Sequence, residues 1–348
     1  MKKTILVAFV IVLALALVAC SGKKEGDASK AAKASKITVK VSHVGPPGCA
    51  RDVGSHKIGE IMEKKFPGKF EFQVYPSGQL GGQREQIEGM QQGAFEISVN
   101  PTAYVGGVVP VITMLGTPFW YPEKYEKLME LFKSPEVKNL FDQTIPFGFY
   151  TFNLYHDGYC HYTAKKPLNV PGDVKGLKVR VMASPILMFQ AQTLGATPIT
   201  MAWGETYSAL QTGTIDGQDN PITNTYDQKL HEVVKFFTLT YHTTVEEAVY
   251  VNKKFFDNLS EEYKKGLLEA IEEGRLAANA TTHRLTDEAV KDMKTKGITF
   301  IELTPEKRQL WIDATAPVRD FARNNYANVG GDKLFDGITA AIKRISAK

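Results

Sequence analysis

The sequence has little net charge and few cysteines. Its 348 residues carry a formal net charge of +4, and only three of them are cysteine. A protein that binds nucleic acid usually presents a concentrated basic face, and no block of like charges occurs in the part of the chain that we expect to fold. We therefore expect no nucleic-acid partner.

Sequence motifs of the common enzyme classes are also absent. The chain has no phosphate-binding loop of the Walker type, no G-x-G-x-x-G, no H-E-x-x-H and no G-x-S-x-G. Cys160 and His161 cannot form a nucleophilic pair with each other, because neighbours in an extended strand face opposite ways. The run HDGYCH at residues 156–161 fits no common zinc pattern, so we interpret it as ordinary loop and strand residues. The sequence predicts no enzyme, no metal site and no cofactor.

A long apolar run occurs at the N-terminus. Residues 1–19 combine a basic start, MKK, with an apolar stretch too short for a comfortable membrane span. The run ends in LVAC, which resembles a bacterial lipobox, and we expect a lipoprotein signal peptide whose removal leaves Cys20 lipidated. The alternative is a plain secretory signal followed by a chance cysteine. Either signal places the body outside the cytoplasm, in the periplasm or at the cell surface, and a lipid on Cys20 would anchor it to a membrane.

The chain beyond this signal begins with a polar segment and contains two further cysteines. Residues 20–35 have no apolar periodicity, which is typical of a flexible tether with a root-mean-square reach of roughly 20–25 Å. An extracytoplasmic location permits a disulfide between Cys49 and Cys160. Two free thiols are equally consistent with the sequence.

Strands alternate with helices along the rest of the chain. The segment ITVKVSHV has the β-branched alternation of a strand, and a helical pattern and a second strand follow it. A helix that ends at Gly93 leads into another strand, and the same order of elements recurs around Gly213. Residues 260–295 have the pattern of one long helix. We expect two α/β lobes with parallel or mixed sheets.

Three polar or aromatic residues lie at junctions between predicted strands and helices. Arg180, in the strand GLKVRVM, pairs with Lys178 on one face and by alternation alone would be a solvated charge. It also lies near the carboxyl end of its strand, where open α/β sheets bind ligands, and a guanidinium suits a carboxylate. Asn220 could simply cap the following helix, and Trp203 could simply be core.

Several long segments carry a family resemblance. YPSGQLGGQREQIEGMQQGAFEISV, GDVKGLKVRV and GATPITMAWGETYSALQTGTIDGQDNP resemble the DctP-type solute-binding proteins of TRAP transporters. The likeness extends over residues 37–338, nearly the whole body. It implies an α/β, two-lobed, periplasmic-binding-protein-like fold with a ligand cleft between the lobes and a long helix that spans both.

The resemblance also implies domain limits and a function. Lobe I would comprise residues 36–156 and 246–284, and lobe II would comprise residues 157–245 and 285–348. Such a protein captures an organic acid by closing its cleft, and delivers it to the integral-membrane subunits of a TRAP-type secondary transporter. An alternative is a ligand-sensing subunit that presents the acid to a membrane receptor.

Five residues match positions that the family uses around its ligand. Arg180 matches the arginine that pairs with the ligand carboxylate, and Asn220 matches a pocket asparagine. Trp203 occupies a usually aromatic position that packs on the ligand. His43 and Asn100 fall near pocket positions of the first lobe.

One position departs from the family pattern. Many members have a second pocket arginine where this chain has Cys160. Its loss favours a monocarboxylate with an apolar or aromatic tail, which Tyr159 and Trp203 would contact. Alternatively, His161 or His43 supplies the missing hydrogen-bond donor. The sequence leaves these two interpretations open.

Overall fold

The computed structural model describes residues 36–347, apart from the side chains of residues 153 and 154. The predicted signal peptide, Cys20 and the tether lie outside the described residues. Within residues 36–347, no helix is both long and apolar enough to cross a membrane.

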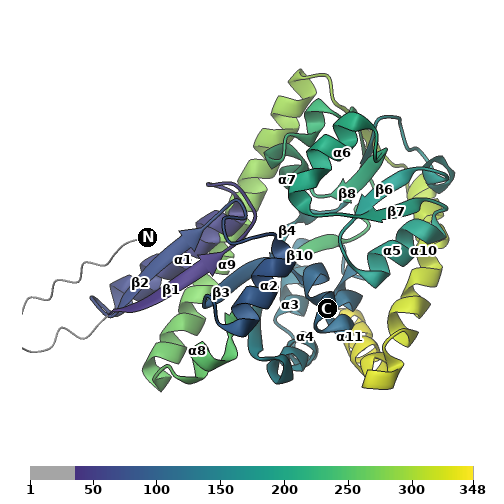
Figure 1. Cartoon of the computed structure of the whole chain (residues 1–348). Coiled ribbons are helices and arrows are strands. Elements are labelled where there is room, and N and C mark those ends of the chain that lie inside the picture. The colour runs from purple at the N-terminus through teal and green to yellow at the C-terminus, as the bar shows by residue number, and fades with distance from the viewer. Residues whose placement is uncertain (1–35, 348) are drawn as a thin grey trace, which may run out of the picture. The chain divides into compact units, whose positions relative to one another are not determined.

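Two β-sheets form the centre of the described chain, and the helices pack on them (Figure 1). The first sheet has the strand order β2-β1-β3-β10-β4. Its members are β1 (Ile37–Ser42), β2 (Phe70–Tyr75), β3 (Ile97–Pro101), β4 (Phe149–Tyr159) and β10 (Thr244–Asn252). Strand β1 is parallel to β2 and β3, whereas β10 runs antiparallel to β3 and β4. The sheet is therefore mixed, as the sequence predicted.

The second sheet has the strand order β11-β9-β5-β8-β6-β7. Its members are β5 (His161–Ala164), β6 (Lys178–Val181), β7 (Thr197–Thr200), β8 (Gly217–Asn220), β9 (Phe236–Leu239) and β11 (Thr299–Glu302). Strand β6 is parallel to β7 and β8, and β5 is antiparallel to β8 and β9. We call the part built on the first sheet lobe I and the part built on the second sheet lobe II.

The chain passes between the sheets at two adjacent places. Strands β4 and β5 are separated by Cys160 alone, and residues 240–243 connect β9 to β10. The Cys160 amide donates a hydrogen bond to the Thr243 carbonyl oxygen (2.8 Å), so the two crossings lie side by side. A short double connection of this kind is a natural place for a hinge.

Helices cover both sheets. Those of lobe I are α1 (Ala50–Lys65), α2 (Gln83–Gln92), α3 (Tyr125–Phe132), α4 (Pro135–Phe141) and α8 (Lys253–Asp257). Those beside the second sheet are α5 (Pro185–Thr193), α6 (Thr206–Thr212) and α7 (Ile222–Asp227). The last three helices of the chain are α9 (Glu261–Thr295), α10 (Pro305–Asn324) and α11 (Gly331–Ser346). Short 3₁₀ turns are η1 (Thr102–Gly107), η2 (Pro110–Gly116), η3 (Asp142–Phe147), η4 (Pro171–Val174), η5 (Trp203–Glu205), η6 (Leu230–Glu232) and η7 (Ala327–Val329).

The predicted long helix is α9, and it belongs to both lobes. Its first half packs on α1 and β4, and its second half contacts α7 of lobe II (Figure 1). The Ser260 hydroxyl accepts a hydrogen bond from the Tyr263 amide (3.2 Å) and so caps the helix, as its position in the sequence suggested. Ala270 and Ile271 lie in the core of lobe I, whereas Met293 lies in a core of lobe II.

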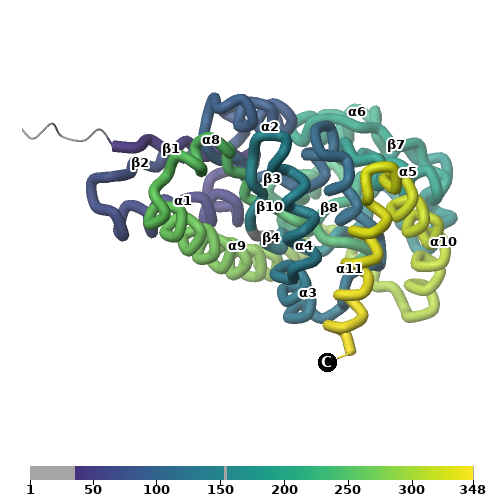
Figure 2. Tube along the Cα trace, turned by 90° about the horizontal axis from the view of Figure 1, so that it is seen from below, coloured from purple at the N-terminus to yellow at the C-terminus, as the bar shows by residue number. Residues whose placement is uncertain are grey.

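The C-terminal helices α10 and α11 pack on each other but differ in their other neighbours. Helix α10 packs on α5, but α11 packs on α3 and α4 of lobe I (Figure 2). Phe335 of α11 stacks on Trp120 with ring centroids 4.4 Å apart. This differs from the expectation that residues 285–348 all accompany lobe II. The apolar face of α11 fills the core beside the first sheet, and a single-chain pattern does not show which lobe supplies its partner.

Candidate functional site

Parallel strands of lobe II end together at the boundary with lobe I. Arg180 of β6 lies opposite Gln218 of β8, so Asn220, two residues further along β8, is at the same sheet edge. Trp203 follows β7 in the 3₁₀ turn η5. The three residues line one cavity of about 10 Å³, which we call the Arg180 cavity. Its remaining lining residues are Arg51, Gln83, Pro101, Tyr104, Met182, Asn224 and Val245.

The small volume of the Arg180 cavity reflects contact between the lobes. Gln83, Pro101 and Tyr104 come from lobe I, whereas Arg180 and Trp203 come from lobe II. Both sets of side chains meet across this narrow space, so the structure shows the cleft closed.

Arg180 is 1% exposed and has only neutral hydrogen-bond partners in the described part of the chain. Its Nη2 donates to the Tyr104 hydroxyl (2.8 Å) and to the Met201 carbonyl oxygen (3.2 Å). The guanidinium carbon lies 5.2 Å from the centroid of the Trp203 ring. The Nε–H has no partner among the described residues. A buried cation with an unused donor is suited to a carboxylate, which accepts two parallel hydrogen bonds from a guanidinium.

Asn220 takes part in the Arg180 cavity and does not cap a helix. The N-cap of α7 is Pro221, and no side chain caps that helix. The Asn220 side-chain amide instead donates to the Gln218 side chain, which holds it in place at the cavity wall. The capping alternative raised by the sequence is therefore not what the structure shows.

A second buried arginine, Arg51, lines the same cavity and was not anticipated from the sequence. It lies in the first turn of α1, and its Nε donates to Glu247 (2.7 Å) while Nη2 donates to Asp157 (3.0 Å). Burial acts to lower its pKa, but these two carboxyls outweigh burial and hold the pKa of Arg51 well above its usual value. Arg51 is thus a charge that the protein itself balances.

A neighbouring cavity of about 10 Å³ shares Arg51, Trp203 and Asn224 with the Arg180 cavity. Its other lining residues are Gly45, Pro46, Cys49, Asp157 and Asp227. Burial raises the pKa of the Cys49 thiol to about 12, so this sulfur is protonated and a poor nucleophile at neutral pH.

A third cavity of about 10 Å³, which we call the Glu246 cavity, shares Pro101, Met182 and Val245 with the Arg180 cavity. Its other lining residues are Thr102, Ala103, Gly116, Cys160, Leu187, Asp219, Thr243, Thr244 and Glu246. Cys160 is therefore beside the Arg180 cavity and not in it. Cys49 and Cys160 are both buried free thiols, and they line different cavities.

Tyr159 and His161 lie elsewhere. They line a separate hollow of about 190 Å³ with His156 and Tyr241, because they flank Cys160 along the chain and face the opposite way. The Tyr159 hydroxyl donates to the Glu123 carbonyl oxygen (3.3 Å). Burial lowers the pKa of His161 to about 3, so it is neutral. The structure does not bring an aromatic wall or a replacement donor from these two residues to Arg180.

His43 and Asn100 are fully buried behind the cavities and line none of the three. His43 Nε2 lies 3.3 Å from Asp52 Oδ1, and the other oxygen of Asp52 accepts from the Gly48 amide (2.8 Å). The Asn100 side-chain amide donates to Gln86 (3.0 Å) and to a serine of β3. Both residues fix the loop and strand ends from which lobe I contributes its part of the site.

The sequence does contain signals for the cleft residues that the sequence analysis did not identify. Arg51 and Tyr104 follow β1 and β3, so they lie at the carboxyl ends of parallel strands, the rule that pointed to Arg180. Glu246 and Glu247 are two adjacent acids in the otherwise apolar strand β10, whose residues are all buried. Charges in a fully buried strand need a partner or a function.

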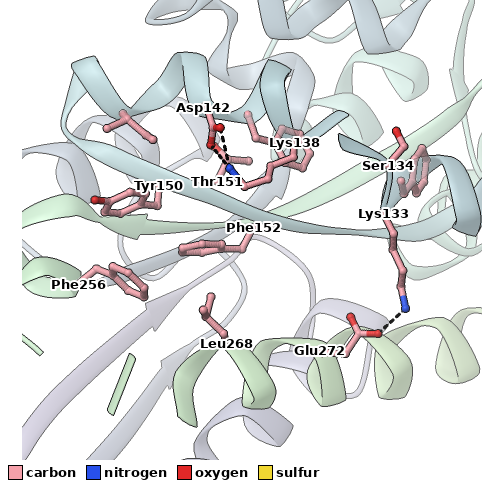
Figure 3. Close-up of a pocket in the computed structure, with 13 residues that line it drawn as sticks. Lys133, Ser134, Lys138, Asp142, Tyr150, Thr151, Phe152, Phe256, Leu268 and Glu272 are labelled. Carbon is pink, nitrogen blue, oxygen red and sulfur yellow. Dashed lines mark hydrogen bonds and ion pairs between the residues drawn. The ribbon is translucent and has the colours of Figure 1, made fainter. Parts of the chain in front are cut away.

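A wide groove of about 560 Å³ lies on lobe I and has no residue in common with the three cleft cavities. Figure 3 shows the rings of Tyr150, Phe152 and Phe256 gathered along it. Its labelled charges are paired, Lys133 with Glu272 and Lys138 with Asp142. The remaining lining residues are Phe132, Ser134, Phe141, Ile145, Thr151 and Leu268. The groove therefore lies apart from Arg180, and its lysines already have acidic partners.

Comparisons with known proteins agree with this arrangement. The DctP family model, described as bacterial extracellular solute-binding protein, family 7, matches residues 41–325. The C4-dicarboxylate-binding periplasmic protein DctP of Rhodobacter capsulatus is 34% identical over 291 residues, which are 83% of this chain and 87% of that protein.

Solved structures are similar over nearly their whole length. A TRAP periplasmic solute-binding protein from Desulfovibrio salexigens with bound orotic acid is 29% identical, with a TM-score of 0.86 and coverage of 89% of this chain and 100% of the other. One from Shewanella oneidensis with bound succinate is 26% identical, with a TM-score of 0.82 and coverage of 88% and 99%.

Proposed function

The chain belongs to family 7 of the bacterial extracellular solute-binding proteins, the DctP family, and we propose that it captures an organic acid at Arg180. The captured acid is delivered to the membrane subunits of a TRAP-type transporter. Because the family is one of binding proteins, the proposal contains no catalytic step.

The main observation behind the proposal is that Arg180 is buried without an acidic partner among the described residues. A guanidinium keeps its proton when buried, and leaving a buried charge without an opposite charge costs roughly 3–5 kcal/mol. Arg180 has neutral partners in the described residues and an unused Nε–H at the cavity. A ligand carboxylate would balance this charge, so ligand binding and cleft closure would stabilise each other.

The relatives support the same class of ligand. Their names record C4-dicarboxylates, orotic acid and succinate, all of which carry a carboxylate at neutral pH. In this chain Arg180 would hold that group, Asn220 would add a hydrogen bond and the Trp203 ring would pack on the rest of the acid. The ligand need not use two arginines, since the second cleft arginine, Arg51, is already balanced by acids.

Attachment to a membrane is the second part of the proposal. The LVAC sequence supports cleavage before Cys20 and lipid addition there, with residues 20–35 as the tether between lipid and body. Metabolic labelling with a radioactive fatty acid in the native host checks this. The wild type should become labelled and Cys20→Ser should not. Equal labelling of both would contradict lipidation at Cys20.

Mass spectrometry of the small molecule released from the denatured full chain tests the capture function. We expect an organic acid, and we expect the same acid to raise the melting temperature in a thermal-shift assay. If no carboxylate is released and none in a broad panel of organic acids raises the melting temperature, the proposal is wrong.

A further inference from the structure

The Glu246 cavity adjoins the Arg180 cavity and contains acceptor oxygens that nothing in the described chain satisfies. Glu246 is 4% exposed, and its Oε1 has no hydrogen-bond partner among residues 36–347. The other carboxylate oxygen, Oε2, receives a single long hydrogen bond from the Thr102 hydroxyl (3.3 Å). Thr243 Oγ1, also at the cavity wall, is likewise buried and has no hydrogen-bond partner in the described part of the chain. Native proteins rarely leave buried acceptors in this state.

A second hydroxyl near Glu246, that of Tyr121, has its shortest hydrogen bond to a backbone oxygen. Tyr121 lies close to Glu246, but its single proton is donated to the Leu115 carbonyl oxygen (2.6 Å). Burial raises the pKa of Glu246 to about 8, although Tyr121 and Thr102 act to lower it. A carboxyl in this position would be ionised only if a donor or a cation approached it.

The charges around this cavity are acidic. Asp219 also lines it and is held by His242, whose Nε2 lies 3.1 Å from Asp219 Oδ2. No lysine or arginine is among the residues that line it. The groups that face Glu246 from the surrounding elements are Thr102 of η1, Tyr121, Cys160, Asp219 with its partner His242, and Glu247 on the same strand.

From this geometry we infer that the ligand is a small zwitterion, a carboxylic acid that also carries a protonated amine, with the carboxylate on Arg180 and the amine in the Glu246 cavity. The inference rests on the proposed function and specifies its ligand. An ammonium group has three donors and no acceptor, which complements the oxygens of Glu246 and Thr243. The two cavities adjoin, since Pro101, Met182 and Val245 line both, and the inference places the carbon chain of the ligand between them.

The size of the cavity narrows the class of amine. A volume of about 10 Å³ accommodates a group the size of one water molecule. A primary ammonium is of that size, and a trimethylammonium is not. A second carboxylate would meet Asp219 as a like charge and would gain no opposite charge from Glu246, so simple dicarboxylates are disfavoured.

Calorimetry with matched pairs of acids tests the inference. The probes are the twenty common amino acids together with β-alanine, 4-aminobutyrate and 5-aminopentanoate, each compared with the acid that lacks the nitrogen. We expect at least one amino acid to bind at least tenfold more tightly than its nitrogen-free counterpart. A set in which none of the amino acids binds, or in which the nitrogen-free acids bind equally well, overturns the inference.

The variant Glu246→Gln shows whether the ligand group that contacts Glu246 is a cation or a neutral hydrogen-bond donor. Glutamine keeps the shape of glutamate and one acceptor oxygen but cannot carry a negative charge. The affinity for the amino acid should fall at least tenfold, whereas that for a nitrogen-free acid should not fall. Glu302→Gln, at an exposed position of β11, is the matched control and should change neither affinity. An amino acid that binds Glu246→Gln as tightly as the wild type contradicts the inference.

The pH dependence of the wild-type affinity for the amino acid also tests whether Glu246 binds the amine. This measurement does not depend on a variant that could fold poorly. The amine must displace the proton of Glu246, so the affinity for the amino acid should rise as the pH increases from 6 to 8, by up to about tenfold per unit. An affinity that is flat or falls over this range contradicts the inference. If the nitrogen-free acids bind through Arg180 as tightly as the amino acids do, the proposed function is supported and only the zwitterion inference is wrong. If neither the amino acids nor the nitrogen-free acids bind, both are wrong.

Discussion

The two buried arginines of the cleft differ in what balances their charge. Arg51 forms ion pairs with Asp157 and Glu247, so its positive charge is already matched within the protein. Arg180 contacts a hydroxyl, a carbonyl oxygen and the face of an indole ring, all of which are neutral. Because both guanidiniums stay protonated, only Arg180 keeps an electrostatic reason to bind an anion.

Burial of His156 predicts sensitivity to acid. Burial lowers its pKa to about 3, and both ring nitrogens lack partners among the described residues. The folded-state pKa is below the unfolded value of 6.5, so the stabilisation is complete above pH 6.5 and is lost as the pH falls toward 3. His156→Phe, packed between Tyr125 and Tyr159, should lessen the loss of unfolding free energy by about 1 kcal/mol per pH unit in this range.

Urea denaturation at pH 7.5 and pH 5.0 measures this difference. The control is His56→Phe, because the His56 side chain is 65% exposed. The control should follow the wild type. If His156→Phe loses as much stability on acidification as the wild type does, His156 is not the group responsible.

Site residues could be predicted from the sequence where they lie at the carboxyl end of a parallel strand, the edge at which open α/β sheets bind ligands. Arg180, Trp203 and Asn220 follow or end parallel strands, so the sequence was enough to bring them to one edge. Tyr159 and His161 were assigned to the cleft because the crossover at Cys160 gives no clue about which face points inward. Glu246 was missed because its significance depends on which residues surround it, and those come from both lobes.

Among the elements, the pair α1 and α9 shows a contact that depends on glycine. A Cβ built on Gly274 would lie 2.8 Å from the Gly54 carbonyl oxygen and 2.7 Å from Ile58 Cγ1. Real Cβ atoms do not approach a backbone oxygen so closely, and a backbone oxygen cannot turn aside. The close approach of these two helices fixes where α9 crosses from lobe I to lobe II.

Gly274→Ala should therefore destabilise the protein even though alanine favours helices. Alanine gains about 1 kcal/mol of helix propensity, but the overlap should produce a net loss of about 1–3 kcal/mol. Gly337→Ala in α11 is the matched control, since its nearest foreign atom, Glu136 Cγ, would be 4.0 Å away. That control should gain about 0.5–1 kcal/mol in chemical denaturation. A stabilised Gly274→Ala would refute the close contact.

Most elements were predictable because their ends carry local signals. Gly93 and Gly213 end helices at φ values of 80° and 76°, a conformation that other residues rarely adopt. Ser260 caps α9 through its hydroxyl. The packing partners of α11 were not predictable, because its apolar face could pack on any neighbouring core. Its contacts with α3 and α4 depend on the tertiary structure.

For the molecule as a whole, closure joins the lobes through a direct hydrogen bond. Tyr104 belongs to lobe I and accepts from Arg180 of lobe II (2.8 Å). Tyr104→Phe removes this bond, and hydrogen bonds to charged groups contribute about 1.5–3 kcal/mol. The closed form should become less populated, which should weaken ligand affinity by roughly tenfold or more.

Calorimetry with the co-purifying acid, together with X-ray scattering of the ligand-free protein, checks this prediction. The variant should bind more weakly and show a larger radius of gyration than the wild type. Tyr207→Phe is the control, because its hydroxyl bonds within lobe II to Glu232 (2.9 Å). Equal affinity and equal radius in Tyr104→Phe would show that this bond does not contribute to closure.

Calorimetry on Arg180→Lys tests most directly whether Arg180 holds the carboxylate of the ligand. Lysine keeps the charge but loses the planar fork that binds both carboxylate oxygens. We expect at least a tenfold loss of affinity for the co-purifying acid, with the melting temperature of the ligand-free protein retained. Arg284→Lys, at a position of α9 that is 57% exposed, should bind like the wild type. An Arg180→Lys protein with unchanged affinity would contradict this role of Arg180.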